Sequence, residues 1–251
     1  MTKRLAHKIA VVTGAGSGIG HGCALMFAKQ GAQVFAVDID KYALEAMQRD
    51  ASYPVTTIEA DLTEPSSVKM LFDQIKAETD HIDILVNAAA VAEFQWIEDM
   101  EYNAHWRHTI TGELDTVFLV CKAAWSLICA SGSGSIINIA SANAHVALKG
   151  SAALAHTAGK GGVLAMTRQL AMEGAPHGIR ANTISPGMIV TPATAPVLKQ
   201  SQLLASVNNK LMLNRLGTPD DIAHLAVYLG SCESSYVTGS DFCVDGGALA
   251  W

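Results

Sequence analysis

Short runs of apolar, mostly β-branched residues recur along the chain and alternate with longer stretches of helical periodicity. The runs are apolar at successive positions, so both faces of each strand are expected to be buried, as in a parallel sheet covered on both sides. This alternation predicts an α/β fold with a doubly wound, seven-stranded parallel sheet and helices on both faces. The predicted strands are residues 9–13, 33–37, 55–60, 82–86, 135–139, 180–184 and 241–244, and the clearest helices are 21–30, 65–78, 105–130 and 158–173.

Length and composition suit one domain that spans residues 1–251, since 50% of the 251 residues are hydrophobic and can form a large core. The net charge of −6, without a basic stripe, disfavours nucleic acid and anionic membranes as partners and favours a small molecule. No run approaches the ~20 apolar residues of a membrane span, and the amino end lacks a signal-peptide pattern, so we expect a cytoplasmic location. The five cysteines lack metal-ligand spacing, which favours reduced thiols and no metal site.

One segment, residues 188–214, has no clear period and contains Pro192 and Pro196. It follows a predicted strand and therefore lies at the carboxyl edge of the sheet, where ligands bind in this architecture. The segment is either a mobile lid over a substrate or a plain pair of connecting helices.

A glycine-rich turn, Thr13-Gly14-Ala15-Gly16-Ser17-Gly18-Ile19-Gly20, follows the first predicted strand and opens a helix. Glycines let the backbone turn sharply there and approach a pyrophosphate, which would sit on the free N–H groups of the helix N-terminus. Asp38 ends the second strand about 20 residues further on, where a carboxylate accepts hydrogen bonds from a ribose and repels a 2′-phosphate. The pattern therefore predicts a site for NAD, with Gly14, Ser17, Gly18, Ile19, Gly20 and Asp38 in contact with it.

This turn and the motifs after it resemble the short-chain dehydrogenase/reductase family over essentially the whole chain. The GxxxGxG spacing is similar to the TGxxxGIG motif of that family, and Ser17 stands where members that use NADP often carry a basic residue. The resemblance implies a Rossmann fold, NAD as cofactor, and a homotetramer or dimer assembled through the two longest helices and the last strand. It also implies cofactor contacts at Asp61 and Leu62 after the third strand, Asn87 and Ala88 after the fourth, and Pro186, Gly187 and Thr191 after the sixth.

Two of the four residues that carry the family's proton transfer have counterparts in this chain. Lys160 matches the lysine that binds the ribose, and Ser141, after the fifth strand, matches the serine that holds the substrate oxygen. His156 stands where the family has its catalytic tyrosine, four residues before Lys160 and so on the same helical face. Glu113 stands where the family has the asparagine of its proton relay. Both departures fall on the proton path.

A histidine can carry out the same proton transfer as a tyrosine. A neutral imidazole accepts a proton from an alcohol and an imidazolium donates one to a carbonyl, with an ordinary pKa near ~6.5 against ~10 for a phenol. Glu113 could pair with Lys160 and accept the relayed proton. We therefore expect His156 as general acid/base, Ser141 as oxygen holder, Lys160 as ribose anchor and Glu113 as the end of the relay. The alternatives are a pocket that has lost its catalyst and, for Glu113, an exposed helical acid.

Three functions are compatible with these residues. The first is an NAD-dependent oxidoreductase that moves a hydride between nicotinamide and a secondary alcohol or ketone of a small polar substrate. The others are a redox-neutral lyase or isomerase with bound NAD, and a catalytically degenerate NAD-binding protein; the fold alone does not choose among them. Side chains placed after predicted strands suggest a polar substrate: Glu93, Trp96, His145 and Met188. A metal site at His105, His108 and Glu113 is less favoured than solvated side chains.

Overall fold

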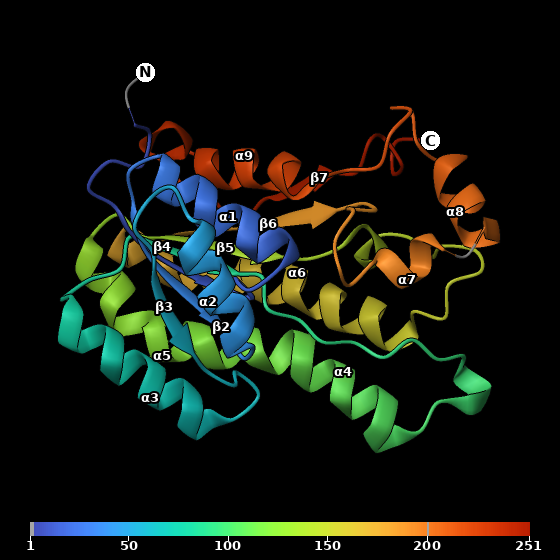
Figure 1. The fold of residues 1–251 in the computed structure, drawn as a ribbon, viewed down its shortest axis with the longest axis horizontal. Helices are drawn as coiled ribbons and strands as arrows, with labels where there is room; N and C mark the ends of the chain where they lie inside the picture. Colours follow the sequence, from blue (N-terminus) through green and yellow to red (C-terminus); the bar gives the residue numbers. More distant parts are fainter. Residues whose placement is uncertain (1–2, 200) are drawn as a thin grey trace.

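A parallel sheet of seven strands forms the centre of the fold, with helices on both sides (Figure 1). The computed structural model describes residues 3–199 and 201–251. The strand order is β3-β2-β1-β4-β5-β6-β7, and every neighbouring pair is parallel. The predicted Rossmann fold is confirmed. The strands are β1 (Ile9–Thr13), β2 (Gln33–Asp38), β3 (Thr56–Glu59), β4 (Ile84–Asn87), β5 (Ser135–Ile139), β6 (Arg180–Pro186) and β7 (Asp241–Val244).

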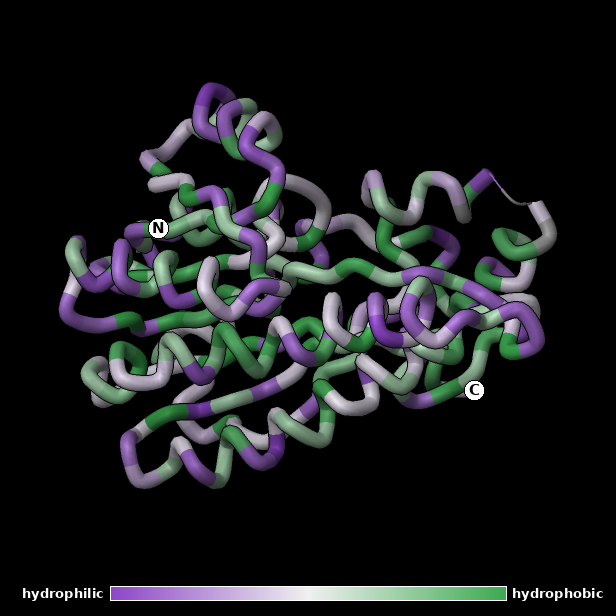
Figure 2. The backbone as a smooth tube through the Cα atoms, turned by 90° about the horizontal axis from the view of Figure 1, so that it is seen from below, coloured by the Kyte–Doolittle hydropathy of each residue, from purple (hydrophilic) through white to green (hydrophobic). Residues whose placement is uncertain are grey.

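Two apolar clusters, one on each face of the sheet, make up the core. Successive residues of β1 belong to opposite clusters, Val12 to one and Val11 to the other, because side chains alternate along a strand. Hydrophobic colour follows the central strands, and the hydrophilic stretches lie mostly in outer helices and turns (Figure 2). One face is covered by α1 (Gly18–Lys29), α2 (Lys41–Asp50) and α9 (Pro219–Gly230), the other by α3 (Pro65–Glu78), α5 (Thr116–Ser131) and α6 (Leu154–Gly174).

The predicted helix 105–130 is part of a longer helical segment, Tyr102–Ser131, whose first half is irregular. Two π-helical turns, η2 (Tyr102–Arg107) and η3 (Thr111–Asp115), flank the short α4 (His108–Ile110), and α5 continues from there. Among the described residues, this is the helix long and apolar enough to cross a membrane by length and composition, but α5 buries Val120, Ala124 and Ile128 in the core beside the sheet. Single π turns frequently occur at functional sites.

Residues 188–214 contain two short helices, α7 (Ala195–Leu198) and α8 (Ser201–Asn208), while position 200 lies outside the described residues. The secondary structure thus matches the connecting helix pair, and motion of this segment as a lid stays a prediction. Four 3₁₀ turns complete the description: η1 (Ile97–Asp99), η4 (Ala142–Ala144), η5 (Ala175–His177) and η6 (Cys232–Ser234).

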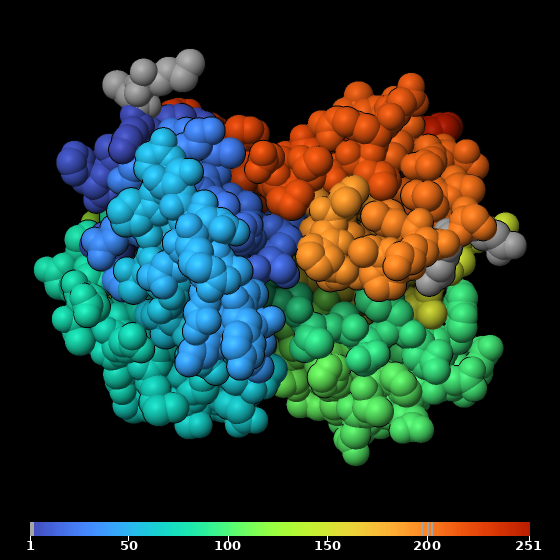
Figure 3. Space-filling view, in the orientation of Figure 1, coloured from blue at the N-terminus to red at the C-terminus, as the bar shows by residue number. Residues whose placement is uncertain are grey.

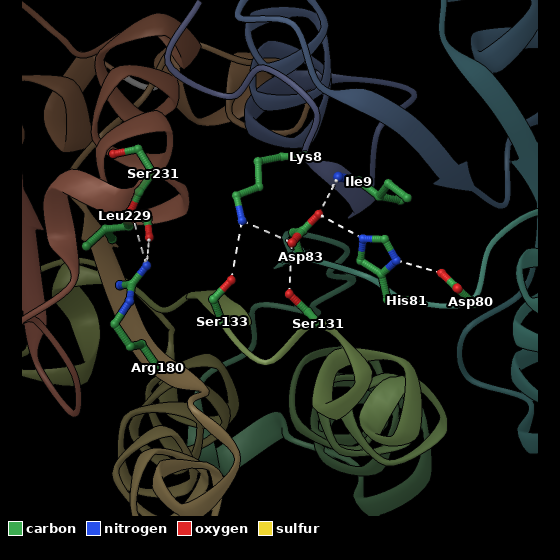
Figure 4. Close-up of polar contacts among 10 residues, drawn as sticks. All are labelled: Lys8, Ile9, Asp80, His81, Asp83, Ser131, Ser133, Arg180, Leu229 and Ser231. Atoms are coloured by element: carbon green, nitrogen blue, oxygen red, sulfur yellow. Dashed lines mark hydrogen bonds and ion pairs between the residues drawn. The ribbon is translucent and has the colours of Figure 1, made fainter.

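At the amino-terminal edge of the sheet, Asp83 joins the start of two strands to the end of a helix (Figure 4). Its carboxylate accepts hydrogen bonds from the Ile9 N–H at 2.9 Å, from Lys8 Nζ at 3.0 Å and from Ser131 Oγ at 2.8 Å. Burial by itself raises the pKa of Asp83, but the hydrogen bonds from Ile9, Ser131 and Lys8 outweigh that effect and hold the pKa below its usual range. This cluster stabilises the edge opposite the one where ligands bind in such sheets.

Candidate active site

The strand order reverses between β1 and β4, and the residues predicted for cofactor binding follow the carboxyl ends of these strands and their neighbours. Ligands of doubly wound sheets bind at this topological switch point. A furrow separates the blue amino-terminal segment from the green and orange segments (Figure 3). A cavity of about 480 Å³ lies along α1, and its lining includes Gly18, Thr191 and Thr218. None of the four expected acid–base residues lines this cavity, so it adjoins the glycine turn and not the proton-transfer site.

The glycine turn requires glycine for steric reasons at two of its positions. Gly14 has a φ of +65°, and a Cβ on it would lie 2.7 Å from the Ala89 nitrogen. A Cβ on Gly20 would lie 2.2 Å from the carbonyl oxygen of Gly14. Ser17 precedes α1 without a capping hydrogen bond from its side chain, so the turn leaves the helix N-terminus to a ligand. This cradle fits the pyrophosphate of a dinucleotide.

Asp38 is held at the end of β2 by two backbone donors. Its Oδ2 accepts a hydrogen bond from the Gly16 N–H at 2.8 Å, and its Oδ1 accepts one from the Asp40 N–H at 2.9 Å. The first of these bonds fixes the carboxylate directly beside the glycine turn. A ribose bound there would meet a preplaced acceptor, as the sequence predicts.

The residues expected at the adenine and along β4 make internal hydrogen bonds in this structure. Asp61 Oδ1 accepts hydrogen bonds from the Thr63 N–H at 2.9 Å and from the Thr63 hydroxyl at 2.6 Å, while Leu62 is buried. Asn87 is only 2% exposed, and its Nδ2 donates to Asn138 Oδ1 at 2.8 Å. The Asn87 Nδ2 is therefore engaged in the core, whereas its Oδ1 has no hydrogen-bond partner among the described residues.

The segment after β6 runs close to the end of β7. The Gly187 N–H donates to the Val244 carbonyl at 3.0 Å, and a Cβ on Gly187 would lie 2.8 Å from the Asp245 Cα. Pro186 ends β6, and Thr191 lies further along the same segment, where a Cβ on Gly18 would lie 3.2 Å from the Thr191 side chain. Thr191 therefore lies beside the N-terminus of α1, while Gly187 lies beside the end of β7.

The structure brings the four expected acid–base residues together from three elements. α6 carries His156 and Lys160, η3 carries Glu113, and Ser141 follows β5 as the N-cap of η4. His156 Nδ1 lies 2.6 Å from Glu113 Oε1, and His156 Nε2 lies 3.2 Å from Ser141 Oγ. A carboxylate only accepts hydrogen bonds, so the neutral imidazole carries its proton on Nδ1 and presents the Nε2 lone pair to Ser141. The arrangement suits Nε2 as a base.

Glu113 is buried, with 2% of its surface exposed, which excludes the interpretation as an exposed helical acid. Its Oε2 has no hydrogen-bond partner among the described residues. Lys160 Nζ lies 4.0 Å from Glu113 Oε1 and donates to the Ile139 carbonyl at 3.0 Å. Burial lowers the pKa of Lys160, and the charge of Glu113 partly opposes that shift. The carboxylate thus contacts the imidazole directly, while the ammonium balances its charge from a greater distance.

Two further residues shape this site and were not predicted from the sequence. A Cβ on Gly159 would lie 3.0 Å from Glu113 Oε2, so the missing side chain makes room for the buried carboxylate. A glycine inside a helix costs stability, so a glycine at position 159 of a predicted helix is a sign that a side chain there would not fit. The Phe94 ring lies 5.4 Å from the His156 ring, tilted by 42°. Phe94 lies in an irregular segment, where no sequence period could place it.

Other candidate residues lie outside this cluster. His105 Nδ1 accepts a hydrogen bond from the Glu101 N–H at 2.9 Å, and Glu113 is turned toward His156, so His105, His108 and Glu113 are not gathered around one point. Trp96 is 50% exposed. His145 Nε2 lies 2.8 Å from Asp241 Oδ2, at the edge of the sheet.

Comparison with known proteins gives matches along the whole chain. Residues 14–248 match the family described as Enoyl-(Acyl carrier protein) reductase. The chain is 32% identical over 249 residues to galactitol 2-dehydrogenase (L-tagatose-forming) of Cereibacter sphaeroides, covering 99% of this chain and 97% of that one. It is 32% identical over 240 residues to the NAD-dependent glycerol dehydrogenase of Listeria innocua, covering 96% and 93%.

Solved structures also match this chain over nearly its whole length. A short-chain type dehydrogenase/reductase from Mycobacterium marinum has a TM-score of 0.92 at 33% identity, with 98% of this chain and 97% of that chain covered. A structure from Beutenbergia cavernae, named as a candidate NAD(P)-dependent gluconate 5-dehydrogenase with NADP bound at low occupancy, has a TM-score of 0.91 at 32% identity over all of both chains. Similar chains thus carry names that include both cofactors.

Proposed function

The chain belongs to the short-chain dehydrogenase/reductase family, and on that premise we propose that it is an NAD-dependent dehydrogenase in which His156 replaces the usual tyrosine. Its substrate is the secondary alcohol of a small polyol or a similar polar molecule, a class supported by the names of two relatives. The observation that carries the proposal is the chain of contacts from buried Glu113 through His156 to Ser141, beside a glycine turn shaped for a dinucleotide.

The residues at the switch point fit NAD. Gly14 and Gly20 leave the space that a Cβ would fill, and the Asp38 carboxylate stands beside the turn. That carboxylate would repel the 2′-phosphate of NADP, and Ser17 offers no positive charge in compensation. Lys160, held by the Ile139 carbonyl, is the anchor for the nicotinamide ribose. When bound, NAD supplies the acceptor for the hydride of the alcohol carbon.

The proton of the alcohol moves to His156 Nε2. Ser141 Oγ, 3.2 Å from Nε2, holds the substrate oxygen, so that oxygen is placed within reach of the base. As Nε2 takes the proton, the ring becomes positively charged, and Glu113 Oε1, 2.6 Å from Nδ1, stabilises this charge. Because Glu113 is buried beside the ring, its attraction to His156 is strongest once the imidazole has become a cation by taking the proton. The reverse sequence serves ketone reduction.

A substrate panel tests this function. The protein is incubated with NAD or NADP and a set of polyols, sugars and hydroxy acids, and reduced cofactor is followed by absorbance. We expect turnover with NAD that His156→Ala lowers about 10²- to 10⁴-fold and that His108→Ala, at an exposed position of the adjoining helix, leaves intact. Substrate turnover without net change of cofactor would contradict the proposal in favour of a lyase or isomerase, and NAD binding without turnover would favour a degenerate site.

We also propose that the protein assembles into a homotetramer or dimer, as its resemblance to the family implies. Large apolar side chains are exposed on two helices expected at interfaces and at the end of the chain: Phe118 on α5 is 51% exposed, Met172 on α6 is 59% exposed, and Trp251 is 71% exposed. A second copy would bury these side chains, which favours a homotetramer or dimer. Light scattering on the purified protein tests this assembly. A cytoplasmic location stays a prediction.

A further inference from the structure

Three metal-ligating side chains meet at the outer edge of the sheet, apart from the acid–base cluster. Asp241 and Cys243 stand two residues apart on the edge strand β7 and so project from the same face. His145 follows η4 and reaches this face from the turn that begins at Ser141. The imidazole, carboxylate and thiol offer ligand atoms that all lie within 4.8 Å of one another. We propose that His145, Asp241 and Cys243 bind a divalent transition-metal ion, Zn²⁺ above all, with water as the fourth ligand.

The ligand types suit zinc, and one of the distances between the ligand atoms already matches its geometry. Zinc takes sulfur, nitrogen and oxygen ligands in tetrahedral geometry, and its bond lengths of about 2.0–2.3 Å place the ligand atoms about 3.3–3.7 Å apart. The Cys243 Sγ to Asp241 Oδ2 distance is 3.7 Å. His145 Nε2 lies 2.8 Å from the same oxygen, which is the length of a hydrogen bond. An ion that replaces this bridging proton would widen the second distance by about 0.5 Å, and His145 lies on an exposed turn that can shift.

Asp241 is already oriented by two neighbouring hydroxyl groups, one of which, Ser185 Oγ, also lies 3.5 Å from His145 Nε2. Its Oδ1 accepts hydrogen bonds from Thr183 Oγ1 at 2.6 Å and from Ser185 Oγ at 2.8 Å. The other oxygen, Oδ2, is the one that faces the imidazole and the thiol. Hydroxyl groups that fix a carboxylate in this way are the usual outer shell of a protein metal site.

The local charge also favours a cation. Besides the two hydroxyls, the hydrogen-bond partners of Asp241 among the described residues are His145 and Cys243, and none of them is Lys or Arg. The carboxylate of Asp241 thus places negative charge directly beside the thiol of Cys243. A divalent ion would neutralise this charge and bind the thiolate.

A bound ion would join two elements of the fold. His145 directly follows η4, whose N-cap is Ser141, and Cys243 lies on the edge strand. The ion would therefore tie the turn that carries the oxygen-holding serine to β7, the strand that we also expect at an interface between copies. Since a ligand that binds the folded state alone stabilises it, zinc should raise the melting temperature of the protein.

Cobalt titration tests the site without any enzymatic assay, so its outcome is independent of the proposed dehydrogenase activity. Untagged, chelator-treated protein with reduced thiols is titrated with Co²⁺. We expect one equivalent to bind with tetrahedral visible bands and a near-ultraviolet thiolate-to-cobalt band, and Zn²⁺ to displace it. Cys243→Ser should remove the thiolate band, whereas Cys232→Ser, at another exposed cysteine, should retain it.

A variant outside the ligand set separates a built site from chance binding. Thr183→Val removes one hydroxyl that orients Asp241 and should weaken cobalt binding about 10- to 100-fold while the thiolate band persists at saturation. Wild-type protein without the thiolate band would overturn the proposal. So would a band that survives in Cys243→Ser, or one that disappears in Cys232→Ser.

Discussion

Replacing Glu113 with Gln removes one charge from the acid–base cluster and leaves the shape of the side chain unchanged. Glu113 Oε1 lies 2.6 Å from His156 Nδ1 and fixes the ring so that Nε2 is the base. An amide in its place presents either its oxygen or its nitrogen to Nδ1. If the nitrogen turns inward, the imidazole must carry its proton on Nε2, where it can no longer accept one from the substrate. Either orientation lacks the negative charge that stabilises the imidazolium.

The size of the effect follows from these contacts. A hydrogen bond to a charged group contributes about 1.5–3 kcal/mol, and each 1.4 kcal/mol corresponds to about tenfold in rate, so loss of the charge alone slows proton transfer about 10- to 100-fold. The wrong tautomer adds to this, up to the ~10²–10⁴-fold that general acid–base catalysis supplies as a whole. We therefore expect Glu113→Gln to lower kcat about 10²- to 10³-fold.

The assay compares kcat and KM of the wild type, Glu113→Gln and Glu101→Gln on a polyol found in the substrate panel. Glu101 is an exposed acid just before the same helical segment, so its variant controls for the general effect of removing a carboxylate. Thermal melting confirms that each variant is folded. An unchanged kcat in Glu113→Gln, with a folded protein, would refute the assignment of Glu113 as the residue that positions and charges the imidazole.

Three other variants examine separate parts of the structure. Gly159→Ala places a Cβ 3.0 Å from Glu113 Oε2 and should lower kcat about tenfold or more by displacing the carboxylate, whereas Gly161→Ala, whose Cβ meets nothing within 4 Å, should not; steady-state kinetics measures both. Asp83→Asn should reduce the free energy of unfolding by about 2–3 kcal/mol at pH 7. Because the pKa of Asp83 is depressed in the folded state, its carboxylate stabilises the fold above its ordinary pKa of ~3.9 and loses this effect as the pH falls through the folded value, so urea titrations should show the two proteins converging in acid. Asp38→Asn should reduce the preference for NAD over NADP by about 1–2 kcal/mol, which is roughly tenfold in the ratio of the two kcat/KM values. An unchanged preference would show that the Asp38 carboxylate does not determine which cofactor binds.

Much of the fold could be predicted because its signals are local. The seven apolar runs gave every strand to within two residues, and the glycine turn gave the start of α1 and the switch point. The start of α9 also has a local signal, a capping box of Thr218 with Asp221 and a proline in the first helical turn.

The site could be predicted only in part, because its geometry depends on contacts between distant segments. Aligning the chain with the family placed Glu113 near the proton path, but the π turn that aims it and the space at Gly159 depend on the packing of two helices. The sequence did not indicate a metal site at His145, Asp241 and Cys243, because His145 is far from the other two residues in the chain and the three do not form a metal-binding motif. The fold brings residues separated by 96 positions within hydrogen-bond distance.

The proposed proton transfer depends most on His156 as the general acid/base, and chemical rescue tests this role of His156 most directly. His156→Ala is assayed with NAD and a substrate in increasing concentrations of imidazole. We predict that kcat falls about 10²- to 10⁴-fold in the variant and rises again with imidazole, because the free base can occupy the vacated space between Glu113 and Ser141. An unchanged kcat in His156→Ala would contradict the account, since the proton would then leave the substrate by another route.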